Sequence, residues 1–314
     1  MKRRSLTLAG ALFLAACMAP AEEDEAATSS ATASAAFEIP EPEPQEADTP
    51  LVEEADDAVA NAPWTSVGAG VAYKRIGAGS NVVIIYGGYT AQLEWVERWC
   101  NELYRVKGAA LGLGHLYAVK GPNQSGYQNH EIENSRLAAH LGANGIAAAA
   151  SSIAVIAHSS GTYVADELFR YVKIGTGGLP AATPSKISYF DLDGGGPGDS
   201  AFVRRFAHAY FVWAYDRVIR LESHNAGGMK SLGASYASLG GGFQVIADRS
   251  GCDRSVNGGL WCMHDALINT RPHNPRMYDL KNDYTDFTSG RALVTSYLSA
   301  LTPYDPRYLA GFRA

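Results

Sequence analysis

Hydrophobic and polar positions along this chain follow two alternating patterns, which predict a succession of strands and helices after residue 80. Short apolar runs of strand character alternate with longer segments whose apolar residues recur at helical spacing. The predicted strands are Asn81–Tyr86, His115–Val119, Ser152–Ala157, Ile187–Asp191, Ala209–Ala214 and Phe243–Ala247. The predicted helices are Leu93–Tyr104, Ile132–Leu141, Thr162–Tyr171, Ala201–Phe206, Met229–Leu239 and Ser289–Leu301.

This alternation predicts an α/β fold for one domain that covers residues 62–314. Strands that are separated by helices favour a mostly parallel, doubly wound sheet with helices on both of its faces. Val71–Ile76 precedes this series and is predicted to add an antiparallel strand. A domain of this length is large enough to bury a sizeable core.

The first 16 residues have the pattern of an export signal. Three basic residues at positions 2–4 precede the apolar run Leu6–Ala16, which is too short to span a bilayer. The run ends in Leu-Ala-Ala-Cys17, which resembles the bacterial lipobox. That resemblance implies cleavage before Cys17, a lipid anchor on its thiol and a place in the cell envelope. An ordinary signal peptide with an incidental cysteine is the alternative.

Residues 17–61 are predicted to form a disordered, acidic tether after the lipidated cysteine. Ala, Glu, Pro, Ser and Thr dominate the segment, and the stretch from Glu22 to Asp57 holds 13 acids and no Lys or Arg. Such a composition buries too little apolar surface to offset the entropy lost on ordering. The whole chain has 32 acids and 26 bases, so without these 13 acids and the three signal bases, 19 acids and 23 bases remain. This mild positive balance gives no support for nucleic-acid binding, and no protein partner is indicated.

The other three cysteines are divided between a loop and a predicted helix. Cys252 and Cys262 bracket a short loop that contains Gly and Asn, and in an exported protein they predict a disulfide. Two reduced thiols are the alternative. Cys100 is expected to be a small buried hydrophobic residue. The chain has no Cys-x-x-Cys or His-Glu-x-x-His spacing, so zinc is not expected.

Residues 153–161, Ile-Ala-Val-Ile-Ala-His-Ser-Ser-Gly, carry the strongest chemical signal. A predicted strand meets a turn of small residues and then an amphipathic segment, which is the setting that exposes a nucleophilic serine on a sharp elbow. The elbow needs small residues two positions before and after the nucleophile, and Ala157 and Gly161 meet this need. Ser159 is therefore the candidate nucleophile, although alanine replaces the usual first glycine of Gly-x-Ser-x-Gly.

A serine nucleophile needs a histidine that takes its proton. The histidine is expected after the last strand of the sheet, where His264 follows the predicted disulfide loop. His273 is the main alternative, and His224 is a weaker one.

The carboxylate that orients this histidine should also follow a strand, because the carboxyl ends of parallel strands meet at one edge of the sheet. We favour Asp216, which begins an Asp-x-Val sequence that resembles the acid turn of many α/β hydrolases. Asp193, two residues after Asp191, ends the preceding strand and is the alternative. The further candidates are Asp248 and Asp253. Asp191 and Asp193 have some character of a calcium loop, but their flanking glycines favour an ordinary tight turn.

An oxyanion hole needs backbone N–H groups beside the nucleophile. One donor is expected from Ser160, directly after the candidate serine. The other is expected in Tyr-Gly-Gly-Tyr after the first parallel strand, where paired glycines allow close backbone approach, so Gly88 or Tyr89 would supply it.

With these residues in the order Ser, Asp, His, residues 80–300 resemble the α/β-hydrolase superfamily. The resemblance implies an esterase-like or lipase-like serine hydrolase that cleaves an ester or similar acyl bond through an acyl-enzyme, without a cofactor. Its expected substrate is a small molecule, a lipid or another acylated compound. A catalytically silent lipoprotein of the same fold that binds a ligand or an envelope partner is the alternative, and cleavage of amide bonds is a third reading.

Overall fold

The computed structural model describes residues 62–89, 91–107, 112–123, 130–196, 200–246, 263–264 and 267 of the chain. The predictions for the signal peptide, the tether, Cys17, the disulfide Cys252–Cys262 and the helix Ser289–Leu301 fall outside these residues. Within the part that is described, no helix is long and apolar enough to cross a membrane.

The observed elements follow the predicted alternation of strands and helices. The strands are β1 (Thr65–Gly68), β2 (Val71–Arg75), β3 (Asn81–Tyr86), β4 (Leu113–Val119), β5 (Ile153–His158), β6 (Ile187–Leu192), β7 (His208–Asp216), β8 (Leu221–Glu222) and β9 (Gly240–Ile246). The helices are α2 (Leu93–Lys107), α3 (Glu131–Ala143), α4 (Ile146–Ala149), α5 (Gly161–Ile174), α6 (Ser200–Val203) and α7 (Ala226–Ser235), with short 3-10 turns at Pro184–Lys186 and Ala237–Leu239.

Several elements differ from the sequence prediction. The short strands β1 and β8 were not expected, because four and two residues are too few to show a period. The predicted helix Ala201–Phe206 is reduced to the four residues of α6. The predicted helix Met229–Leu239 instead begins at Ala226 and ends at Ser235, before the 3-10 turn.

The sheet is mixed but mostly parallel, which confirms the predicted fold class. Its strand order is β1-β2-β4-β3-β5-β6-β7-β8, and β9 also pairs with β7. The pairs β3–β4, β3–β5, β5–β6, β6–β7 and β7–β9 are parallel. The edge strand β2 runs antiparallel to β4, as predicted. From β3 the chain passes to β4 on one side and then returns to β5 on the other, which creates a switch point between β3 and β5.

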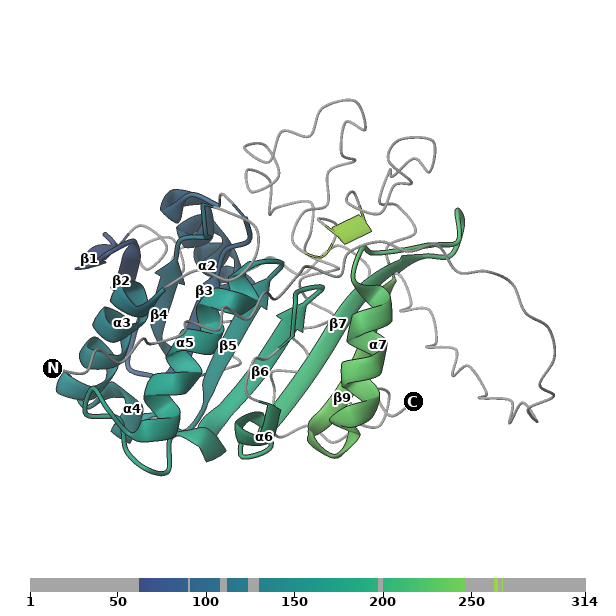
Figure 1. Cartoon of the computed structure of the whole chain (residues 1–314). Helices are drawn as coiled ribbons and strands as arrows, with labels where there is room; N and C mark the ends of the chain where they lie inside the picture. The colour runs from purple at the N-terminus through teal and green to yellow at the C-terminus, as the bar shows by residue number, and fades with distance from the viewer. Residues whose placement is uncertain are drawn as a thin grey trace, which may run out of the picture. The chain divides into compact units, whose positions relative to one another are not determined.

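Alternate residues of the central strands point into two separate cores. In β3, Val83 and Ile85 belong to the core under α2, whereas Val82 and Ile84 belong to the core under α3, α5 and α7. All four side chains are at most 1% exposed. Strands that are covered on both faces must be apolar throughout, which explains the continuous hydrophobic runs of the sequence. Figure 1 shows α3, α5 and α7 together in front of the sheet.

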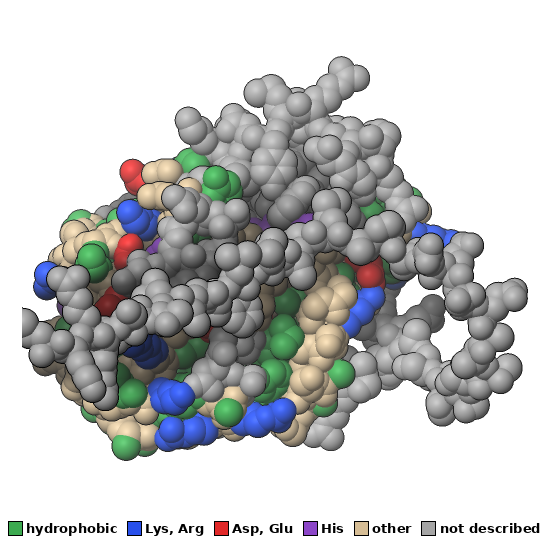
Figure 2. Space-filling model, viewed as in Figure 1, with side chains coloured by type: hydrophobic (Ala, Val, Ile, Leu, Met, Phe, Trp, Pro, Cys, Tyr) green, Lys and Arg blue, Asp and Glu red, His purple; other side chains and the backbone are tan. Residues whose placement is uncertain are grey.

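This topology brings several loops to one edge of the sheet. In open parallel sheets, ligands bind outside the carboxyl ends of the strands, next to a switch point. The loops that follow β3 and β5 lie on either side of this switch point. Figure 2 shows histidine side chains at the upper margin of the described surface, whereas Lys and Arg side chains gather along the lower edge.

Candidate active site

The turn between β5 and α5 has the geometry of a nucleophile elbow. Ser159 has a φ of 55°, in the left-handed region that residues other than glycine rarely adopt. Its N–H donates to the carbonyl of Leu192 at 3.1 Å, and its own carbonyl accepts from Thr162 Oγ1 at 2.9 Å. These bonds hold a strained residue in place at the carboxyl end of β5.

Close packing explains why the elbow needs small residues. A Cβ atom on Gly161 would lie 2.6 Å from the carbonyl oxygen of Gly87 and 2.9 Å from that of Tyr86. Ala157 is fully buried and pairs with Tyr86 across the parallel strands β3 and β5. The elbow and the loop after β3 are therefore in contact, and both of the small residues predicted around Ser159 lie at this contact.

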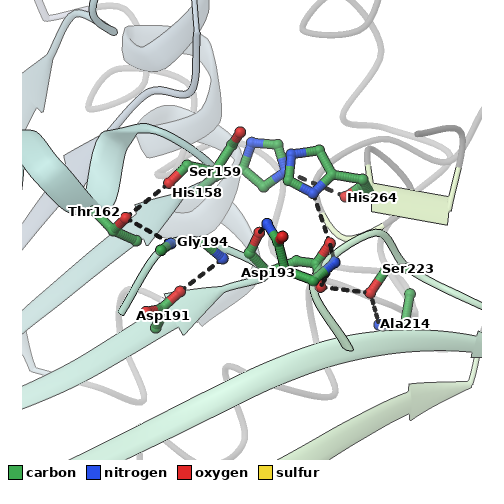
Figure 3. A network of polar contacts seen from close by, with 11 residues as sticks. His158, Ser159, Thr162, Asp191, Asp193, Gly194, Ala214, Ser223 and His264 are labelled. Atoms are coloured by element: carbon green, nitrogen blue, oxygen red, sulfur yellow. Dashed lines mark hydrogen bonds and ion pairs between the residues drawn. The ribbon is translucent and has the colours of Figure 1, made fainter. Parts of the chain in front are cut away.

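The carboxylate that meets His264 belongs to Asp193, directly after β6. Its Oδ2 lies 2.6 Å from His264 Nδ1, and both side chains are nearly inaccessible to solvent. Asp193 Oδ1 accepts hydrogen bonds from Ser223 Oγ at 2.7 Å and from the N–H of Asn225 at 3.1 Å. Figure 3 shows the carboxylate between His264 and Ser223. With Nδ1–H donated to Asp193, the neutral imidazole keeps Nε2 as its proton acceptor.

The surroundings of Asp193 keep it ionised. Burial alone would raise the pKa of this carboxyl group, but the hydrogen bond and charge of His264 act in the opposite direction. The bonds from Asn225 and Ser223 add to that effect, and the pKa lies below its usual value. An ionised carboxylate is the form that orients a histidine and stabilises its cation.

Our preference for Asp216 over Asp193 is corrected by this contact. Asp216 is the last residue of β7, and its Oδ1 accepts the N–H groups of Val218 at 2.9 Å and Ile219 at 3.1 Å. These bonds close the turn that leads to β8, a structural role that suits the Asp-x-Val sequence equally well. The other proposed acids, Asp248 and Asp253, lie outside the described residues.

His264 is 2% exposed and makes contacts with two further histidines. Its ring centroid lies 4.6 Å from that of His158, with 38° between the ring planes, and His158 Nε2 lies 3.2 Å from the backbone carbonyl oxygen of His264. His224, the weaker alternative, lies edge-on to His264 at 6.5 Å. The main alternative, His273, falls outside the described residues.

The predicted oxyanion segments occupy neighbouring positions at the same edge of the sheet. Gly87 donates its N–H to Val119 at 3.0 Å, and the carbonyl of Gly88 accepts from Ala91 at 3.1 Å. Tyr89 follows and is 38% exposed. Ser160 immediately precedes α5, where the first N–H groups of the helix have no partner inside it and favour negative charge.

Close packing around this loop requires glycine at positions 87 and 121. A Cβ on Gly87 would lie 2.6 Å from Ala91 Cβ, and a Cβ on Gly121 would lie 1.6 Å from the carbonyl oxygen of Gly88. Gly88 and Tyr89 therefore lie in the loop that contacts the elbow, and Ser160 lies in the elbow itself; their role as oxyanion donors stays a prediction.

Four residues of the site were missed by the sequence reasoning. They are His158, Thr162, Ser223 and Asn225. The sequence pattern places His158 only in the turn before the serine and Thr162 only in the helix after it. Ser223 and Asn225 lie around the start of α7, and no motif in that region pointed to Asp193.

Comparisons with known proteins gave matches only among solved structures. No protein-family model and no curated protein matches the chain. A thermostable esterase from Pseudomonas putida is 11% identical, with a TM-score of 0.44 over 76% of this chain and 81% of that chain. An α/β hydrolase from a deep-sea metagenome library is 14% identical, with a TM-score of 0.39 over 79% and 97%.

Aspergillus fumigatus lipase B is 13% identical, with a TM-score of 0.33 over 74% of this chain and 63% of that chain. Such distant similarities say nothing about substrate or mechanism. The fold is instead defined by the strand order of the sheet and by the elbow between β5 and α5.

Proposed function

We propose that this chain, whose sheet and elbow are those of the α/β-hydrolase fold, is a serine hydrolase that cleaves an ester or similar acyl bond. The observation that carries the proposal is the 2.6 Å contact between His264 Nδ1 and Asp193 Oδ2, beside the elbow of Ser159. A serine on an elbow is a weak nucleophile unless a base takes its proton. The buried acid–histidine pair supplies one, because the carboxylate of Asp193 orients the imidazole of His264 at the same edge of the sheet.

In the proposed acylation, Ser159 Oγ attacks the substrate carbonyl carbon while its proton passes to His264 Nε2. The carbonyl oxygen becomes an oxyanion, which accepts hydrogen bonds from the N–H of Ser160 and from Gly88 or Tyr89. Asp193 stays ionised and stabilises the imidazolium. The imidazolium then gives its proton to the leaving alcohol as the bond between the carbonyl carbon and that oxygen breaks.

Deacylation repeats these steps with water as the nucleophile. His264 takes a proton from water as the water oxygen bonds to the acyl carbon, and the proton then goes to Ser159 Oγ as the acid is released. Each half-reaction restores the proton balance, so no further reactant is required. This cycle gives an enzyme that is acylated on Ser159 in turnover.

The decisive experiment is covalent labelling with a fluorophosphonate, followed by mass spectrometry of the labelled peptide. We expect one adduct, on Ser159, and no adduct in Ser159→Ala. Loss of the nucleophile should lower kcat by about 10⁶-fold. Absence of an adduct on the folded wild-type protein would instead support a catalytically silent binding protein of this fold.

The substrate class is tested separately, with a panel of p-nitrophenyl esters of increasing acyl length beside acetylated sugars and amides. We expect turnover of esters. A preference for long acyl chains would favour a lipid substrate, and a preference for short chains would favour a small molecule. Cleavage of amides without cleavage of esters would contradict the proposed bond class.

We further propose that the enzyme is exported and lipidated at Cys17, as the lipobox-like Leu-Ala-Ala-Cys sequence indicates. Residues 17–61 would then hold the catalytic domain away from a membrane. Metabolic labelling with a fatty acid in a bacterial host should modify the wild type and leave Cys17→Ser unlabelled. Equal labelling of both would contradict the proposed anchor.

A further inference from the structure

His158 is a buried histidine that the proposed mechanism does not use. It is the last residue of β5, directly before the elbow, and it is 2% exposed. Its ring packs on the ring of His264 at a centroid distance of 4.6 Å, and its Nε2 lies 3.2 Å from the carbonyl oxygen of His264. Because a carbonyl oxygen only accepts, His158 Nε2 must carry the hydrogen of this bond.

Two neighbouring strands hold His264 at two separate points. His158 pairs with Leu192 across β5 and β6, and Asp193 comes directly after Leu192. Asp193 accepts from the imidazole of His264, while His158 donates to its backbone. Figure 3 shows the two imidazole rings side by side above Asp193. With the bond to Asp193 alone, the imidazole of His264 could still rotate about that bond. The second bond, from His158 to the backbone of His264, restricts this rotation.

We infer that His158 is a positioning residue, which fixes the backbone and ring plane of His264 relative to Ser159. This inference rests on the proposed function, because it assigns His158 an effect on turnover through His264. The placement matters because a shift of about 1 Å in a reacting group costs about 100-fold in rate. His158 does not itself touch the reacting atoms in this scheme.

Two substitutions separate the hydrogen bond from the ring packing. H158F keeps a buried aromatic ring and loses the donor, whereas H158Q supplies an N–H donor at a similar distance from the backbone without the ring. We expect H158F to lower kcat by about 10-fold to 100-fold, with KM within about 3-fold of the wild type. We expect H158Q to restore kcat to within about 5-fold of the wild type, because the bond to the His264 carbonyl returns.

H115F is the matched control for loss of a buried histidine. His115 is 8% exposed, lies in β4 and contacts Tyr73 Oη through Nδ1 at 3.0 Å. We expect H115F to lower the melting temperature without a comparable loss of kcat. If H158F fails to fold, H158M provides a flexible apolar side chain that also lacks the donor. Equal kcat in the wild type and in the folded donor-free variant would overturn the inference.

A double-mutant cycle with His264→Ala tests whether His158 acts through His264. The residual rate of Ser159 labelling by the fluorophosphonate is compared in H264A and in H264A/H158F. We expect the second substitution to change this rate by less than about 2-fold, because residues that act as a unit are not additive. If H158F lowers the labelling rate in H264A by as large a factor as it does in the wild type, the positioning role would be overturned.

The same reagent separates failure of this inference from failure of the proposed function. If wild-type Ser159 is not labelled, the proposed function fails and the inference falls with it. If the wild type is labelled and H158F is labelled at the same rate, the inference alone fails. Slow labelling of H158F together with rescue in H158Q supports it.

Discussion

Asp191 and Asp193 stand two residues apart at the end of β6, yet their surroundings give the two carboxyl groups opposite protonation states near neutral pH. Burial raises the pKa of Asp191 to about 8, with a further rise from the charge of Asp193. Asp193 is also buried, but the contacts from His264, Asn225 and Ser223 lower its pKa. The compensating contacts, rather than burial itself, therefore decide which carboxyl group serves as the ionised partner of the histidine.

Replacing each candidate acid by its amide distinguishes their roles. We expect Asp193→Asn to lower kcat by about 10⁴-fold, because an amide can hold the imidazole in the wrong tautomer and cannot stabilise its cation. Asp216→Asn should leave kcat within a few-fold of the wild type. Steady-state kinetics on one ester checks both variants, and a larger loss in Asp216→Asn would refute the assignment of Asp193.

At the scale of elements, hydrogen bonds connect the nucleophile elbow to the turn after β6. Ser159 and Asp193 both adopt left-handed φ values, 55° and 50°. Thr162 is fully buried in the first turn of α5, and its hydroxyl donates to the carbonyl of Ser159 at 2.9 Å and accepts from the N–H of Gly195 at 3.0 Å. Figure 3 shows Thr162 between Ser159 and the turn that contains Gly194. One hydroxyl thus links the two strained turns that carry the nucleophile and the acid.

Thr162→Val removes this bridge while it preserves the shape of the side chain. We expect kcat to fall by about 10-fold and the free energy of unfolding to fall by about 1–3 kcal/mol, because the N–H of Gly195 loses its partner. Thr162→Ser keeps the hydroxyl and is expected to keep kcat within a few-fold. Kinetics and urea unfolding of both variants provide the test, and equal activity of the Val and Ser variants would contradict the bracing role.

At the scale of the whole molecule, Asp191 links protonation to the stability of the sheet. It is fully buried in the central strand β6, and its Oδ1 accepts from the N–H of Gly194 at 2.8 Å. The cost of burying a charge here exceeds what the hydrogen bonds to the carboxylate return, so the folded protein favours the neutral acid. The stability contributed by this group is complete below the unfolded-state pKa, and it is lost as pH rises through the folded-state pKa of about 8.

The pH dependence of unfolding tests this coupling. Between about pH 4 and pH 8, the free energy of unfolding of the wild type should fall relative to that of Asp191→Asn. The Asn variant does not titrate, and its amide oxygen can still accept from Gly194. Urea unfolding at several pH values measures the difference, with Asp216→Asn as the control. A difference that does not change with pH would contradict a raised pKa for Asp191.

The sequence by itself determined the order of the central strands and the longer helices, and the position of the elbow. Local signals carry this information: β3, β5 and β6 are apolar because both faces are covered, and the periods of α2, α3 and α5 reflect one buried side. Ala157 and Gly161 could also be recognised as a pair, because the turn around Ser159 leaves room only for small side chains two positions before and after the serine.

Only the tertiary structure decided which acid meets the histidine. Asp193 follows β6 and Asp216 ends β7, and the carboxyl ends of both strands meet at one edge of the sheet, so nothing local distinguishes the two acids. The contact joins His264 to a residue 71 positions earlier in the sequence. The roles of His158 and Thr162 were hidden for the same reason. Their partners are backbone groups, which strand register and turn geometry bring close. Because every residue has the same backbone groups, the sequence does not show which of them a side chain will contact.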